Sequence, residues 1–249
     1  MAEVSRDAIL GGRVVLAQPT RGYRVNVDAV LLAAFAAHRL GRDPGARVTP
    51  SPARALFDLG AGVGAVGLSV LALAAARRAV LVEVDSRYAT LAADNVRDNG
   101  HAMRAEVFVG DVRAAARAHP AGADLVVANP PYVPEGRGRP PAEHRARARS
   151  GDVAVFLDAA RTLLGVRGRA CFVYPAIEAT SLLGALRARG LEPKRIAFVH
   201  GAPDAPARVV LVEAKPGRPG GLVVTPPVVE TDGRGRPSGT LAAVLRGEG

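Results

Sequence analysis

Short apolar runs alternate with longer amphipathic stretches along the chain from residue 54 onward. The runs predict buried β-strands, because they are short, rich in valine and leucine, and bounded by turn residues. Seven strands are expected, at Ala55–Leu59, Val80–Val84, Glu106–Val109, Leu125–Ala128, Ala170–Tyr174, Arg195–His200 and Arg208–Glu213. The amphipathic stretches predict helices, at Val66–Ala76, Arg87–Asn99, Val112–Ala118, Val153–Leu164 and Ala179–Arg189. Strands separated by such helices indicate a Rossmann-like α/β fold with a seven-stranded, mostly parallel sheet.

The last two strands are joined differently from the others. Only the connection "GAPDAPA" separates Arg195–His200 from Arg208–Glu213, which leaves no room for a crossover helix. Antiparallel strands can be joined by such a short connection, whereas parallel strands cannot. We therefore expect a C-terminal antiparallel hairpin at one side of the sheet.

The two ends of the chain differ from this pattern. Leu16–Asn26 is polar and turn-like, and the stretch "AVLLAAFAAHRL" after it predicts a buried helix with Asp28 as its N-cap. Ser86 is the expected N-cap of the helix at 87–99. Arg42–Ala53 contains three prolines and is expected to be a linker or long loop. Residues 1–53 are thus expected to form a substrate or cofactor lid with its linker, 54–214 the sheet domain, and 215–249 a small appendage with a weak helix near its end.

Charge and composition narrow the class of protein. The net charge of +10 favours a polyanionic partner such as nucleic acid, although arginine supplies nearly all of it and biased codon usage is an alternative explanation. The single cysteine, Cys171, excludes a disulfide framework and a cysteine zinc site, and the five scattered histidines suggest no metal. The N-terminus "MAEVSRDAIL" has charges where the apolar core of a signal peptide would begin. The longest uncharged run, Leu59–Ala76, is glycine-rich, so we expect no membrane span and a cytoplasmic protein.

The stretch "LFDLGAGVGAVG" ends the first strand and opens a helix. Its glycines, Gly60, Gly62, Gly64 and Gly67, let the backbone approach a ligand at the helix N-terminus. The last three match the dinucleotide fingerprint, with Glu83 about 20 residues further on, so a nicotinamide oxidoreductase is one hypothesis. Asp58 lies at the C-terminal end of the strand, separated from Gly60 only by Leu59, where a carboxylate would repel a pyrophosphate but would suit an ammonium group. This favours S-adenosylmethionine as the cofactor.

Three acidic residues then receive expected roles, each just past a strand. Asp58 would accept the cofactor's ammonium, Glu83 both ribose hydroxyls, and Asp111 the adenine amino group. Alternatives remain for each of them. Asp58 and Asp111 could instead cap helices, and Asp85 could be the ribose carboxylate.

The fourth strand ends in "DLVVANPPYVP". With "FDLGAGVG", "VEVD" and "GDV" before it, the chain resembles class I S-adenosylmethionine-dependent methyltransferases of the amino-methylating N-P-P-Y type. The resemblance implies that the Asn129 side-chain oxygen and the Pro130 carbonyl accept the hydrogens of a target amine, and that Asn129 also borders the cofactor. Pro131 stiffens the turn, and Tyr132 offers a face on which a planar substrate stacks.

The ends of the chain extend this resemblance. Three further segments resemble bacterial valine-tRNA (adenine-37) N6-methyltransferases. They are "GGRVVLAQPTRGYRVNVDAVLLAAFA", "PPAEHRARARSGDVAVFLDAA" and "LVVTPPVVETDGRGRPSGTLAAVL". This implies tRNA as the partner. Arg145, Arg147 and Arg149 are candidate substrate contacts because they follow the catalytic strand, although a solvated loop is an alternative for each of them. Arg24 is a further candidate contact, and a monomer is the favoured state. Ribosomal RNA guanine-N2 and release-factor glutamine-N5 methyltransferases remain alternatives. A non-catalytic RNA-binding protein is another, and the intact Asn129 and Tyr132 argue against it.

Overall fold

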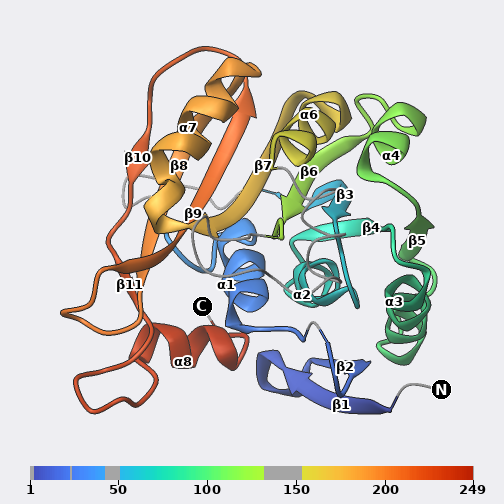
Figure 1. The fold of residues 1–249 in the computed structure, drawn as a ribbon, viewed down its shortest axis with the longest axis horizontal. Helices are drawn as coiled ribbons and strands as arrows, with labels where there is room; N and C mark the ends of the chain where they lie inside the picture. The colour runs from blue at the N-terminus through green and yellow to red at the C-terminus, as the bar shows by residue number, and fades with distance from the viewer. Residues whose placement is uncertain (1–2, 23, 43–50, 132–152, 249) are drawn as a thin grey trace.

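The large sheet of the protein is built from the alternating segments that the sequence predicts. The computed structural model describes residues 3–22, 24–42, 51–131 and 153–248. The long strands of the large sheet are β3 (Ala53–Leu59), β4 (Ala76–Glu83), β5 (Ala105–Val109), β6 (Ala123–Ala128), β7 (Leu164–Pro175), β8 (Leu191–His200) and β9 (Ala207–Pro216). Their order across the sheet is β8-β9-β7-β6-β3-β4-β5 (Figure 1). Strands β3 to β7 are parallel to one another, and β8 and β9 form the antiparallel hairpin at one side. The predicted α/β sheet with its hairpin is confirmed.

The tail of the chain adds two short strands to this sheet. Strands β10 (Val223–Val224) and β11 (Val228–Val229) both pair in parallel with β8, on the edge away from β9. Helix α8 (Gly239–Leu245) follows them and contacts helix α1.

Helices cover both faces of the sheet. Helices α1 (Val27–Ala36), α2 (Ala65–Ala72) and α3 (Ser86–Asp98) pack on one face, and α4 (Val112–Ala118), α6 (Val153–Leu163) and α7 (Ala179–Ala188) pack on the other. The strands have apolar residues on both sides, as parallel strands between two helix layers require. In β6, for example, Leu125 and Val127 belong to the core under α1 and α2, whereas Val126 and Ala128 belong to the opposite core. No helix in the described part of the chain is both long and apolar enough to span a membrane.

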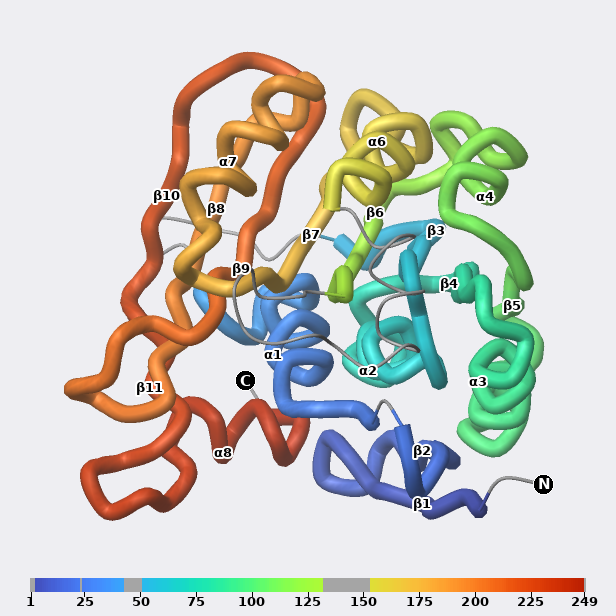
Figure 2. The backbone as a smooth tube through the Cα atoms, in the orientation of Figure 1, coloured from blue at the N-terminus to red at the C-terminus, as the bar shows by residue number. Residues whose placement is uncertain are grey.

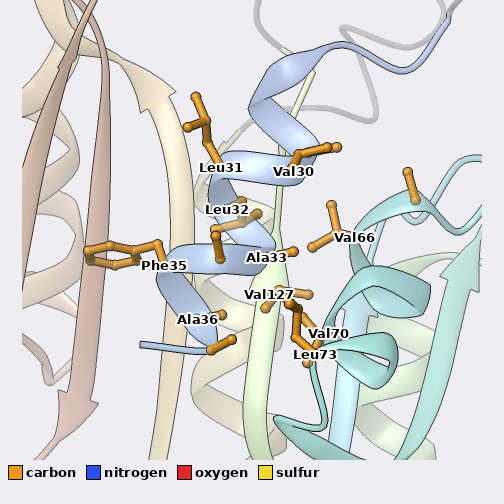
Figure 3. Packing of buried hydrophobic residues seen from close by; sticks show 14 of the residues in the cluster. Val30, Leu31, Leu32, Ala33, Phe35, Ala36, Val66, Val70, Leu73 and Val127 are labelled. Carbon is orange, nitrogen blue, oxygen red and sulfur yellow. The ribbon is translucent and has the colours of Figure 1, made fainter. Parts of the chain in front are cut away.

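Helix α1 packs on the sheet beside α2 and is buried from Ala29 to Ala36. Figure 3 shows Val30 and Ala33 turned toward Val66 of α2, above Val127 of β6, with Phe35 turned to the other side. The N-cap is Asn26, whose side chain accepts a hydrogen bond from the Asp28 backbone N–H. The prediction that Asp28 is the cap is therefore wrong, because Asp28 already lies in the first helical turn. Its carboxylate instead lies 2.7 Å from the Arg208 guanidinium.

The C-terminus of α1 is held by arginines from the sheet. Arg195 of β8 is buried and donates to the carbonyls of Phe35, Leu40 and Gly41, and its guanidinium also pairs with the Glu213 carboxylate at 2.9 Å. The Arg195 guanidinium lies 3.8 Å from the centre of the Phe35 ring. Asp28, in the first turn of α1, pairs with Arg208, which lies near the end of β7. Helix α1 therefore runs antiparallel to β6 and β7. Its N-terminus therefore lies at the edge where the parallel strands end.

A second, two-stranded sheet precedes α1. Strands β1 (Val4–Ile9) and β2 (Val14–Pro19) form an antiparallel hairpin through the short helix η1 (Leu10–Gly12). The prediction that the chain is turn-like from Leu16 onward is therefore wrong up to Pro19. Leu16 is buried, and polar Gln18 is buried because its amide donates to Asp7 and accepts from the Val25 N–H. Figure 2 shows the hairpin and α8, the two ends of the chain, side by side.

Candidate active site

The carboxyl ends of four parallel strands meet at one edge of the sheet. Strand β3 lies between β4 and β6, and Leu59 at its end aligns with Val82 on one side and with Ala128 on the other. The next residues, Gly60, Glu83 and Asn129, therefore lie in a row. The chain continues from β3 to β4 on one side and returns to β6 on the other, so this row marks the topological switch point of the sheet. Ligands of open α/β sheets bind at such a point.

Three polar side chains near these strand ends belong to the same face of the sheet. Side chains alternate along a strand, and Leu56, Leu81 and Val127 all face the core beneath α1 and α2. Two residues further along, Asp58, Glu83 and Asn129 continue this alternation. The sequence alone grouped these residues by function, and the structure brings them to one edge and one face.

The glycine loop after β3 is shaped by left-handed backbone. Gly60, Gly62 and Gly64 have φ angles of +71°, +58° and +88°, which residues other than glycine rarely adopt. A Cβ atom on Gly60 would lie 3.1 Å from the Phe156 ring of α6, whereas the position above Gly62 is open. The loop is fixed to β4, because the Gly60 and Ala61 N–H groups both donate to the Val82 carbonyl. Helix α2 begins directly after the loop, so its N-terminus faces the same edge.

Asp58 is buried beneath this loop, with 1% of its surface exposed. Its Oδ2 accepts a hydrogen bond of 2.8 Å from the Gly67 N–H in the first turn of α2. The pKa of the Asp58 carboxyl is raised to about 7, chiefly by burial; the Gly67 N–H lowers the pKa and the Glu83 charge raises it, and both effects are smaller than that of burial. The carboxyl is therefore half-charged near neutral pH. The contact with Gly67 is the helix-capping role considered above, and it engages only one of the two carboxylate oxygens.

Glu83 is held by two backbone donors at the end of β4. Its Oε2 accepts from the Gly62 N–H and its Oε1 from the Asp85 N–H, both at 2.8 Å. Asp85 is the N-cap of α3 and pairs with the Arg87 guanidinium, so the prediction that Ser86 caps this helix is wrong. Of the two carboxylates considered for the ribose, Glu83 is the one bonded directly to the glycine loop.

Asp111 follows β5 and caps α4, since its Oδ1 accepts from the Arg113 N–H at 2.8 Å. Its capping role is thus present, and a contact to adenine stays a prediction. Sequence reasoning missed two apolar residues on this rim. Val84 and Val109 are 57% and 61% exposed at the ends of β4 and β5. The signal available for Val84 was a valine between two acidic residues, where a flat apolar surface adjoins Glu83.

The predicted catalytic segment is described only in part. Asn129 is half-buried, Pro130 is buried and Pro131 is exposed. Tyr132 and the arginines at 145, 147 and 149 lie outside the described residues. Arg24 pairs with the Asp7 carboxylate at 3.0 Å and donates to the Ser5 hydroxyl, so it also supports the N-terminal hairpin. Its contact with substrate stays a prediction. The described residues hold no cluster of His, Cys, Asp and Glu suited to a metal ion.

Comparison with known proteins identifies the family. The sequence model of the methyltransferase small domain matches residues 44–174, which is more than half of the chain. The chain belongs to this family. Its membership confirms the predicted resemblance and decides against a nicotinamide oxidoreductase.

Relatives and solved structures agree with this assignment. The tRNA1(Val) (adenine(37)-N6)-methyltransferase of Parabacteroides distasonis is 29% identical over 195 residues, 76% of this chain and 76% of the relative. The release factor glutamine methyltransferase of Cereibacter sphaeroides is 30% identical over 177 residues, 66% of this chain and 60% of the relative. The crystal structure of a predicted O-methyltransferase from Agrobacterium tumefaciens superposes with a TM-score of 0.67 at 22% identity, covering 88% of this chain and 95% of that chain. The class I methyltransferase fold is therefore confirmed.

Proposed function

We propose that this methyltransferase uses S-adenosylmethionine to methylate adenine N6 in the anticodon loop of a tRNA. The observation that carries the proposal is the position of Asn129. It directly follows the buried strand β6, in register with the glycine loop that follows β3. An amine acceptor and a cofactor loop at adjacent strand ends are what methyl transfer to an amine requires.

The residues of the switch point fit this cofactor. The left-handed glycines leave open space above Gly62, and the Gly62 N–H donates to Oε2 of Glu83. Glu83 would accept the ribose hydroxyls, Val84 would cover the adenine ring, and Asp58 would receive the ammonium group. Asp111 would accept the adenine amino group with the oxygen that does not cap α4. When bound, the cofactor supplies an electrophilic methyl group on a positively charged sulfur.

The segment from Asn129 to Tyr132 acts on the amine. The lone pair of an exocyclic amine is delocalised into the ring, so the amine is a poor nucleophile. The Asn129 side-chain oxygen and the Pro130 carbonyl accept its two hydrogens and favour a tetrahedral nitrogen, whose lone pair then points toward the methyl group. Pro130 and Pro131 fix the backbone without adding N–H donors. The nitrogen loses its proton after transfer, so no general base is needed beforehand.

The substrate assignment is supported by the relatives and by charge. The Parabacteroides distasonis relative is named for adenine 37 of a valine tRNA and matches three quarters of this chain. The net charge of +10 suits an RNA substrate, with Arg24 and the arginines at 145, 147 and 149 as candidate phosphate contacts. We also propose that the protein is cytoplasmic and monomeric. Residues 1–53 would act as the lid and linker, 54–214 as the catalytic domain, and 215–249 as an appendage.

A glutamine amide of a release factor is the second candidate. The release-factor relative from Cereibacter sphaeroides favours it, because an amide nitrogen poses the same chemical problem as adenine N6. Mass spectrometry of tRNA nucleosides from cells lacking the gene distinguishes the two. Loss of N6-methyladenosine is expected, whereas unchanged tRNA with an unmethylated release-factor glutamine would refute the RNA assignment.

Asn129→Ala tests the chemistry at the site. We expect turnover to fall by roughly 10²–10³-fold, the range seen when one preorganised polar group is removed from a reaction centre. The dissociation constant of S-adenosylmethionine, measured by calorimetry, should stay within about threefold, because the cofactor's main polar contacts are to Asp58 and Glu83. Unchanged turnover on the true substrate would show that Asn129 does not hold the amine.

A further inference from the structure

Asn95 of α3 and Asn99, the C-cap residue of that helix, both hydrogen-bond to the backbone of strand β2. Asn99 accepts from the Val15 N–H at 2.8 Å and donates to the Val15 carbonyl at 2.7 Å. Asn95, one helical turn earlier, accepts from the Ala17 N–H at 2.7 Å and donates to the Ala17 carbonyl at 3.0 Å. Residues four apart on a helix lie on one face, and residues two apart on a strand point their backbone groups to one side. The helix therefore pairs with β2 in the manner of a neighbouring strand.

Asn95 makes one more hydrogen bond, and this bond connects it to the glycine loop. The second hydrogen of its amide donates to the Val63 carbonyl at 2.9 Å. Val63 lies inside the glycine loop, between Gly62 and Gly64. The Asn95 side chain is fully buried, and both of its amide hydrogens and its oxygen are engaged. The carboxamide of Asn95 in helix α3 is thus bonded to both the N-terminal hairpin and the glycine loop.

The hairpin leads directly to the other parts of the site. A Cβ atom on Gly22 would lie 3.2 Å from the Tyr88 hydroxyl, and Tyr88 lies in the first turn of α3, just after Glu83 and Asp85. The Val25 N–H then bonds to Gln18 of β2, and Asn26 caps α1 at the carboxyl edge of the sheet. A shift of β2 would therefore displace the chain beside the ribose carboxylate and the start of α1 together.

We propose that Asn95 is a positioning residue that couples the N-terminal hairpin to the glycine loop. Binding in the loop fixes the Val63 carbonyl and, through Asn95, strengthens the docking of β2, and docking of β2 in turn strengthens binding. Such a coupling is reciprocal by thermodynamic necessity. The identity of the ligand rests on the function proposed above, whereas the connection itself rests on the three hydrogen bonds of Asn95.

Asn99 is the matched control. It forms the same pair of bonds with β2, but its remaining hydrogen donates to the Asn95 backbone carbonyl within α3, and not to the glycine loop. Asn95→Ala and Asn99→Ala should therefore loosen the hairpin to a similar degree. They should differ in their effect on ligand binding.

The experiment combines calorimetry with hydrogen exchange, using S-adenosylhomocysteine as the ligand. We expect Asn95→Ala to raise its dissociation constant about tenfold, which corresponds to about 1.4 kcal/mol, and Asn99→Ala to change it less than about twofold. In the wild type and in Asn99→Ala, the ligand should slow exchange of the Ala17 amide, and in Asn95→Ala this slowing should be lost. Equal dissociation constants for the two variants would overturn the coupling.

Two further outcomes separate the inference from the proposed function and from simple misfolding. If Asn95→Ala does not fold, hydrogen exchange of the wild type is the deciding measurement. Absence of ligand-dependent protection at the Ala17 amide then refutes the coupling without any variant. If the wild type does not bind S-adenosylhomocysteine, the proposed cofactor is wrong, and the inference fails together with it. Binding without protection at β2 refutes only the inference.

Discussion

The proposed contact between the buried carboxyl of Asp58 and the cofactor's ammonium group predicts that cofactor binding depends on pH in a defined direction. Its pKa in the free protein is raised to about 7, chiefly because burial removes water from it. Receiving an ammonium group requires the charged carboxylate. Binding should therefore lower the pKa of Asp58 and release a proton whenever the free protein holds one.

The size of the effect follows from that pKa. A group with a pKa near 7 is about 0.9 protonated at pH 6 and about 0.1 protonated at pH 8. Nearly one proton should leave per ligand bound at pH 6, and almost none at pH 8. Binding should weaken about fivefold between pH 7 and pH 6 and about tenfold for each further unit of acidification, because the protonated carboxyl must first ionise.

Calorimetry measures this proton directly. The observed binding enthalpy at pH 6 should change with the ionisation enthalpy of the buffer, and the slope gives the number of protons released. S-adenosylhomocysteine suits the assay, because it retains the ammonium group and cannot be turned over. Methylthioadenosine is the control ligand, since it retains the nucleoside but lacks the amino-acid portion and should release no proton.

Two results would refute the reasoning. One is a dissociation constant for S-adenosylhomocysteine that is constant between pH 5.5 and pH 7, which would mean that Asp58 does not meet the ammonium. The other is a proton release that survives in Asp58→Asn, which would assign the titration to another group. The Asn variant should bind more weakly than the wild type at pH 7.5 and show little dependence on pH between these limits.

Two further predictions concern stability and are read from urea denaturation. Arg195→Leu should lower the free energy of unfolding by about 3 kcal/mol, because it removes the guanidinium that hydrogen-bonds the buried Glu213 carboxylate at 2.9 Å. A loss below about 1 kcal/mol would contradict this. Gly67→Ala should destabilise by roughly 1–3 kcal/mol, since its Cβ would lie 2.3 Å from Leu81 and 3.1 Å from the Asp58 oxygen. Gly184→Ala on α7, where the space is open, should instead stabilise by roughly 0.5–1 kcal/mol, so equal effects of the two changes would exclude packing as the cause.

The sheet was predictable because its strands are buried on both faces. Each of β3 to β9 overlaps a predicted strand, but β4 and β7 begin earlier than expected, at Ala76 and Leu164, and β4 ends one residue before the predicted Val84. Their first residues include Arg77, Arg78 and Arg167, which are exposed and interrupt the apolar pattern while the backbone still pairs. Helix α2 ends at Ala72, short of the predicted Ala76, because Ala74 adopts a left-handed φ of +56°. A pattern of apolar residues cannot reveal where backbone bonding continues beyond the core.

The N-terminal hairpin was not predicted from the sequence, for a different reason. Buried Gln18 read as a surface residue, because its partners Asp7 and Val25 come together only in the folded chain. The Gly11–Gly12 pair was the available signal for a turn between two strands. At the site, the strand-end rule located Asp58, Glu83 and Asn129 correctly along the sheet, since parallel strands share a carboxyl edge. The rule could not find Asn95, whose importance depends on a tertiary contact from the middle of a helix.

The two short strands of the tail have a consequence for the behaviour of the protein in solution. By pairing with β8, β10 and β11 occupy backbone groups that would otherwise be free to bond to another molecule. An open strand edge is a template for edge-to-edge aggregation. Truncation before Val223 would uncover β8 and make the protein prone to self-association at the concentrations used for purification, even though no residue of the switch point is removed.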